Sequence, residues 1–165
     1  METQWLDDEQ LDAWVKLVAV IELLPAVLDS QLRRDAGLTH FEYFVLAMLS
    51  DSEDRTLRMT SLAPRTNATL PRLSHVVRRL EDRDLVERFP CPDDGRATNA
   101  RLTDTGWAEV VAAAPGHVAN VRHHVIDALT PSQLHQLREI ADALLTRLDP
   151  EGRMSGLHRR AESHA

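Results

Sequence analysis

The chain has 165 residues, of which 43% are hydrophobic and 27% charged, so it has the size of one domain and is too apolar to be disordered. It contains no apolar run long enough to span a membrane, and the acidic residues among its first ten positions exclude a typical signal peptide. We therefore expect a cytoplasmic protein with no membrane partner. The single cysteine, Cys91, excludes an internal disulfide and a thiolate zinc cage.

The net charge of −7 argues by itself against a nucleic-acid-binding protein, whose binding face must be electropositive. The distribution of charge changes this interpretation. Between Arg55 and Arg101 ten arginines stand against six acidic residues, a local balance of +4, whereas the rest of the chain carries −11. The sequence thus places a basic middle between two acidic ends.

The first two helices are predicted from the spacing of apolar residues. Steps of three and four residues indicate a long helix over residues 8–36. Pro25 should kink or divide this helix, and Gly37 should end it. Thr39 and Glu42 then form a capping box, which predicts the start of a second helix.

The middle of the chain alternates short helices with turns. Thr60 or Ser61 is predicted to cap a short third helix, and a turn at residues 67–69 leads into a fourth helix with Pro71 in its first turn. The fourth helix has one apolar face, formed by Leu73, Val76, Val77 and Leu80.

Two strands and two further helices follow. Residues 85–89 and 98–102 alternate in polarity around a Pro- and Gly-containing turn, which predicts a β-hairpin. Thr103 should cap a fifth helix that is interrupted or kinked near Pro115. The run Thr-Pro-Ser-Gln from Thr130 is typical of the start of a helix and predicts a sixth.

This order of elements predicts a mainly α fold with a small β-hairpin wing: a winged helix-turn-helix with N- and C-terminal dimerisation helices. The apolar stripes of the terminal helices exceed what so small a lobe can cover, so we expect them to pack together and against a second copy. The single domain, residues 1–165, would consist of a winged helix-turn-helix DNA-binding lobe at 39–102, dimerisation helices at 8–36 and 104–149, and a flexible tail at 150–165.

A longer motif makes the class more specific. The wing carries Asp-x-Arg, five further residues and Leu-Thr, and in this respect residues 10–148 resemble the MarR family of winged-helix transcriptional regulators. The motif and the other similar positions are Asp94, Arg96, Leu102, Thr103, residues 59–63, Leu73-Ser74, Leu80, Leu85-Val86 and Gly106.

Two positions depart from the family pattern. Asp84 stands where relatives have a glycine that ends the fourth helix in a left-handed conformation, which aspartate tolerates at small cost. Gly95 replaces a basic residue at the wing tip, which weakens the expected wing contact. The resemblance implies a homodimeric, sequence-specific DNA-binding regulator, most often a repressor, that binds a pseudo-palindromic operator in double-stranded DNA and is released by a small-molecule effector.

The candidate DNA-binding residues lie on the polar face of the fourth helix and on the wing. Arginine can hold guanine through two hydrogen bonds, and a guanidinium at the wing can enter the minor groove. We expect Asp94 to orient Arg96 through a charge-assisted hydrogen bond, although the pair could simply hold the hairpin. A solvated helix face is the plainer alternative for the rest. The full set is Thr69, Pro71, Arg72, Ser74, His75, Arg78, Arg79, Asp94 and Arg96.

The resemblance further implies an effector pocket between the first, second and fifth helices. Its walls are expected from the aromatic residues Trp14, Tyr43, Phe44 and Trp107, and its polar hooks from His40, His117 and Arg122. Cationic hooks suit a small organic effector that is an anionic aromatic or a carboxylate. Ordinary core packing is the alternative for each of these residues taken singly.

Other functions find less support in the sequence. No catalytic motif or phosphate-binding glycine loop is present, so we predict neither an enzyme nor a cofactor. The eight histidines are poorly spaced for a metal, although His40 and Glu42 could converge with one of His117, His123 and His124 in a metal-responsive regulator. The net charge and Gly95 keep open a dimeric protein-interaction module that has lost its affinity for DNA.

Overall fold

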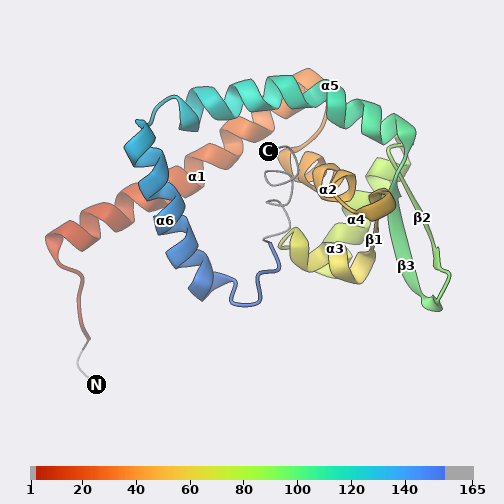
Figure 1. Ribbon diagram of the computed structural model, residues 1–165, viewed down its shortest axis with the longest axis horizontal. Helices are drawn as coiled ribbons and strands as arrows, with labels where there is room; N and C mark the ends of the chain where they lie inside the picture. The colour runs from red at the N-terminus through yellow and green to blue at the C-terminus, as the bar shows by residue number, and fades with distance from the viewer. Residues whose placement is uncertain (1–2, 155–165) are drawn as a thin grey trace.

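The computed structural model describes residues 3–154 and is mostly helical with one small antiparallel sheet, which confirms the predicted fold class. In Figure 1, helices α2, α3 and α4 and the sheet form a lobe, while α5 runs from the sheet along α1 and α6 follows at the end far from the lobe. The elements are α1 (Asp8–Ala36), α2 (His40–Ser50), η1 (Glu53–Arg55), β1 (Thr56–Arg58), α3 (Met59–Arg65), α4 (Leu70–Glu81), β2 (Val86–Cys91), β3 (Asp94–Leu102), α5 (Asp104–Val121), η2 (Arg122–Ile126) and α6 (Pro131–Leu148).

Pro25, expected to kink or divide the first helix, does not divide it, because α1 is continuous over 29 residues. A proline removes one amide donor from a long helix, and the hydrogen bonds on both sides of it remain. Gly37 ends the helix as predicted, in the left-handed conformation with φ of 63°. Pro115 likewise lies inside α5 without interrupting it.

The lobe holds the core. Its fully buried side chains come from the end of α1, the turn after it, α2, α3, α4 and β2, and they include Leu32, Leu38, Leu46, Leu49, Leu62, Leu73, Leu80 and Val86. The capping box of Thr39 and Glu42 starts α2 as predicted, with both of its hydrogen bonds formed. This core fixes α4 against α2 and α3.

The sheet has three strands in the order β1-β3-β2, one more than the predicted hairpin. Strand β1 is only three residues long and pairs with β3 from Thr56 opposite Arg101 to Arg58 opposite Asn99. Because this strand ends at Arg58, α3 begins one residue later, and Arg58 is its N-cap without a side-chain hydrogen bond. The predicted cap at Thr60 or Ser61 is therefore wrong.

The wing and α5 meet closely. Asp84 adopts the left-handed conformation, with φ of 57°, as expected for a residue in place of glycine. The backbone N–H of Thr103 donates to the Leu85 carbonyl at 3.1 Å, and a Cβ on Gly106 would collide with that same carbonyl. Glycine is therefore required where α5 begins against β2.

Helix α6 begins with the predicted capping box of Thr130 and Gln133. Beyond it, the described part of the expected tail forms a turn in which the Asp149 carboxylate accepts the N–H groups of Arg153 and Met154. Residues 155–165 lie outside the described residues. None of the helices in residues 3–154 combines the length and apolar character needed to cross a bilayer.

Candidate nucleic-acid interface

Helix α4 presents a polar face to solvent. Thr69 caps the helix, its hydroxyl accepting the N–H of Arg72 at 3.4 Å. The face opposite the buried leucines and valines consists of exposed residues one turn apart: Pro71, His75, Arg78 and Asp82. Three of the predicted DNA-binding residues thus share one exposed surface.

The flank of α4 that faces α2 is engaged within the protein. The Arg72 guanidinium lies over the ring of Phe41, 4.3 Å from its centroid. Arg79 donates to one carboxylate oxygen of Glu42, at 3.0 Å from Nε and 2.8 Å from Nη2. The structure therefore gives these two predicted DNA-binding residues partners inside the lobe.

The opposite flank of α4 contacts the wing. Arg88 on β2 donates to the Glu81 carboxylate through Nε and Nη2, at 2.9 and 2.6 Å, and to the Ser74 hydroxyl at 3.2 Å. Ser74 is half-buried, so it supports the junction between α4 and the wing. Sequence reasoning missed Arg88 and Glu81 because their contact crosses a turn and follows no helical spacing.

At the wing tip Arg96 is exposed, but Asp94 does not orient its guanidinium as predicted. The Asp94 carboxylate instead accepts the backbone N–H of Arg96 at 3.1 Å. A short polar side chain commonly stabilises a tight turn in this way. Asp94 therefore shapes the hairpin, and Arg96 extends from it into solvent.

Charge pairing separates the arginines of the basic middle into two groups. Five of the ten pair with carboxylates, namely Arg55, Arg79, Arg83, Arg88 and Arg101. Arg78 and Arg96 are exposed and form no ion pair with any residue of the described chain. Arg58, Arg65 and Arg72 also form no ion pair within residues 3–154, but Arg58 donates to Cys91 and Arg72 lies over the ring of Phe41. Arg78 on the outer face of α4 and Arg96 at the wing tip thus present unpaired positive charge to solvent.

Three of the seven candidate effector residues converge between α2 and α5. The His117 ring lies 4.7 Å from that of Tyr43 and 5.9 Å from that of His40, measured between centroids. Burial lowers the pKa of both histidines, and it raises the pKa of Tyr43. His117 Nδ1 and Gln31 Oε1 are buried polar atoms without a hydrogen-bond partner among the described residues.

A groove of about 470 Å³ adjoins this cluster. Helices α1, α2 and α4 all contribute to it, with Pro25, Ala26, Asp29, His40, Phe41, Phe44 and Arg72 as its lining. Two candidate residues, His40 and Phe44, therefore face this space. Arg72 also lines this groove. It therefore connects the groove to α4 and does not belong to the outer face of the helix.

The other three candidates lie elsewhere. Trp14 is exposed on the N-terminal half of α1, Trp107 packs beneath the guanidinium of Arg55, and Arg122 pairs with Asp127. Helical spacing alone could not distinguish these positions from those around the groove.

No three histidine, cysteine or acidic side chains within residues 3–154 are grouped so that they could hold a metal ion. Glu42, one of the ligands considered for a metal, turns toward Arg79 instead. Cys91 is buried in the wing and accepts a hydrogen bond from Arg58 at 3.3 Å. Hydrogen bonds from the backbone of Asp93 and Asp94, together with Arg58, lower the pKa of this thiol.

Comparison with known proteins agrees with this geometry. The model of the MarR family matches residues 38–98. The chain is 44% identical to Sco3205, a MarR family transcriptional regulator from Streptomyces coelicolor solved in complex with DNA, with 90% of this chain and 93% of that one covered and a TM-score of 0.87. AbsC, a MarR family transcriptional regulator from the same organism, is 38% identical, with 88% and 98% covered and a TM-score of 0.84.

The curated relatives are more distant. The transcriptional repressor MprA of Escherichia coli is 25% identical over 113 residues, which cover 68% of this chain and 64% of MprA. The HTH-type transcriptional repressor YetL of Bacillus subtilis is 29% identical over 85 residues, which cover 52% and 51%. The chain thus spans between half and two thirds of the length of these two relatives.

Fold and comparisons together define the class of winged-helix transcriptional regulators, in agreement with the prediction of a protein that is not an enzyme. Within that class, the chain belongs to the MarR family.

Proposed function

We propose that this protein is a sequence-specific DNA-binding repressor whose helix α4 enters the major groove. The observation that carries the proposal is the exposed face of Pro71, His75 and Arg78, whose arginine forms no ion pair within the described chain. An arginine on such a face can bind guanine O6 and N7 together. Support comes from Sco3205, 44% identical, which was solved in complex with DNA, and from the repressors among the curated relatives.

The repressor would act as a homodimer on a pseudo-palindromic operator. Helices α1, α5 and α6 expose large apolar side chains such as Ile21, Val118 and Ile140. A second copy packing on these helices would bury them and present two α4 helices to successive major grooves.

The groove beside α2 supports an effector site of the kind expected from the sequence. Its lining combines the aromatic rings of Phe41 and Phe44 with the guanidinium of Arg72, and His40 adds a ring nitrogen. This chemistry suits a small anionic aromatic such as a benzoate. Such a ligand would contact α4 directly through Arg72 and so alter the placement of the helix on DNA.

The proposal is tested by fluorescence-anisotropy titration of the purified protein against the DNA beside its own gene, at two salt concentrations and with scrambled competitor. Replacing His75 or Arg78 by alanine should relax sequence preference, because base contacts specify the site. Arg96→Ala should weaken binding to all sequences and reduce the salt slope by about 1, because it removes a phosphate contact. The exposed Arg34→Ala at the end of α1, outside α4, the wing and α6, is the matched control.

Operator binding that is normal in the His75, Arg78 and Arg96 variants would contradict the assignment of this face. Absence of any specific binding by the wild-type protein would favour a protein-interaction module instead. Benzoate is tested separately, by adding it to the complex of protein and operator and measuring the release of DNA by anisotropy. The Arg72→Ala variant should no longer release the operator when benzoate is added.

A further inference from the structure

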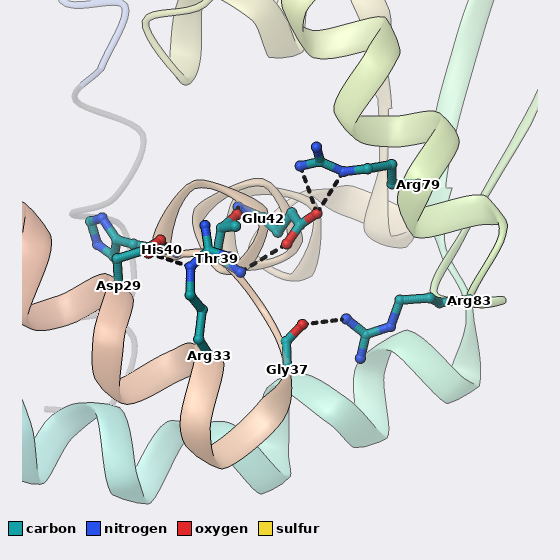
Figure 2. A network of polar contacts seen from close by, with 8 residues as sticks. All are labelled: Asp29, Arg33, Gly37, Thr39, His40, Glu42, Arg79 and Arg83. Carbon is teal, nitrogen blue, oxygen red and sulfur yellow. Dashed lines mark hydrogen bonds and ion pairs between the residues drawn. The ribbon is translucent and has the colours of Figure 1, made fainter.

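Glu42 is a buried carboxylate shared by two helices. Its side chain is shielded from solvent at the start of α2, where one oxygen accepts a hydrogen bond from the backbone N–H of Thr39 at 2.8 Å. Its other oxygen accepts from Nε and Nη2 of Arg79 on α4. Figure 2 shows the carboxylate between these two donors. Burial by itself raises the pKa of Glu42, but the hydrogen bonds from Thr39 and Arg79 outweigh it and hold the pKa below its usual value.

A second arginine joins the same two regions. Arg83, in the turn after α4, donates to the carbonyls of Gly37 and Ala36 at 3.0 and 3.2 Å. These carbonyls end α1 and have no partner within the helix, so the guanidinium satisfies them. Arg83 also approaches Glu109 of α5 at 4.0 Å. The end of α4 and the turn after it are therefore attached to the corner between α1 and α2 by two separate contacts, one from Arg79 and one from Arg83 (Figure 2).

The same corner borders the groove described above. The backbone N–H of His40, the first residue of α2, donates to Asp29 of α1 at 2.9 Å, and both residues line the groove. Glu42 lies one half turn further along α2. A movement of the first turn of α2 relative to α1 therefore displaces the carboxylate that holds Arg79.

We propose that Glu42 and Arg79 are positioning residues for DNA recognition, which set the placement of α4 relative to the corner between α1 and α2. Arg79 then acts through Glu42 and makes no contact with DNA. The competing assignment treats Arg79, whose side chain is 47% exposed, as a phosphate contact that Glu42 restrains. This inference rests on the proposed DNA-binding function, and it names a second contact, besides Arg72, through which the groove and α4 are coupled.

The two assignments predict opposite effects of Glu42→Gln. The amide keeps the oxygen that accepts from Thr39 but loses the charge that holds Arg79. For a positioning residue, Glu42→Gln and Arg79→Gln should each lower operator affinity on the order of 10-fold, and the double variant should be no weaker than either single variant. The slope of log K against log salt should stay at the wild-type value, because no phosphate contact is lost.

The result that overturns the proposal is equally specific. If Arg79 contacts phosphate, Arg79→Gln reduces the salt slope by about 1, and Glu42→Gln raises affinity because it removes a negative charge beside the DNA. Additive losses in the double variant would also overturn the proposal. The exposed pair Asp12 and Lys16 on α1 supplies the control, as Asp12→Asn and Lys16→Gln.

Hydrogen exchange of the free protein separates this inference from the proposed function. Loss of the contact should speed exchange of the α4 amides in both Glu42→Gln and Arg79→Gln, while exchange in α6 stays unchanged. Unaltered exchange in α4 would overturn the positioning role even if the protein binds DNA normally. A wild-type protein that binds no operator would overturn the proposed function, and the exchange measurement would still test the contact.

Discussion

The lobe and the helical arms differ in the exposure of their apolar residues. The arms are defined as α1 up to residue 27, α5 from residue 114 and α6, because the first half of α5 packs into the core of the lobe with Val110 and Ala113. In the lobe, Leu46, Leu62 and Leu73 have no exposed surface. In the arms, Ile21, Val118 and Ile140 are 54%, 54% and 57% exposed. Exposed apolar area costs about 25 cal/mol per Å², so the lobe is stabilised by its own chain whereas the arms require another surface.

The largest expected effect comes from the lobe. Leu46→Ala leaves a cavity in a closed core and should lower the free energy of unfolding by about 3 kcal/mol. Urea unfolding followed by circular dichroism measures it. The matched control is Val20→Ala on the exposed face of α1, which should cost less than about 0.5 kcal/mol at low protein concentration. Equal losses in the two variants would remove the distinction between lobe and arms.

A charge on the arms should act on association rather than folding. Ile140→Asp places a carboxylate among exposed apolar residues of α6 and should weaken dimerisation by about 100-fold, or about 2.7 kcal/mol. Sedimentation velocity across a dilution series measures the shift. Thr146→Asp adds the same charge at an exposed position on the other side of α6 and serves as the control. A dimer that resists Ile140→Asp would place the interface elsewhere.

Acidification should weaken the contact between lobe and arm. The pKa values of His40 and His117 are lowered in the folded protein, so the unfolded chain binds protons more readily. Stability is then present above the unfolded histidine pKa of about 6.5 and is lost as the pH falls below it, by at most about 1.4 kcal/mol per pH unit for each histidine. Unfolding at pH 7.5 and 5.5 tests the sign, and His117→Gln should flatten the dependence.

The smallest effect is expected for the surface charges of the arms. Asp12 and Lys16 are mostly exposed, so Lys16→Gln should change the free energy of unfolding by less than about 0.5 kcal/mol. A larger change, measured by the same urea titration, would show that this pair is buried by an interface in the dimer.

The sequence predicted most helices because their starts are local signals. Thr39 with Glu42 and Thr130 with Gln133 each form within four residues, and both capping boxes are present. Strand β1 was missed because three residues show no periodicity and its stability comes from pairing with β3, more than forty residues later. Local pattern cannot reveal such pairing.

The candidate site was predicted in outline for the same reason. The helical wheel separated the buried face of α4 from its polar face, and His75 and Arg78 are exposed as expected. It could not show that Arg79 finds Glu42, 37 residues earlier, or that Ser74 receives Arg88 from the wing. A helical arginine beside a buried carboxylate looks the same in sequence as one facing solvent.

The tight junction at Gly106 has a mechanical consequence. Because α5 begins against the Leu85 carbonyl with no space for a side chain, we expect α5 and the base of the wing to move together as one rigid unit. In the proposed dimer, the angle between the two arms would then be converted into the distance between the two wings. The dimer would in this way select operators whose two halves are separated by a particular number of base pairs.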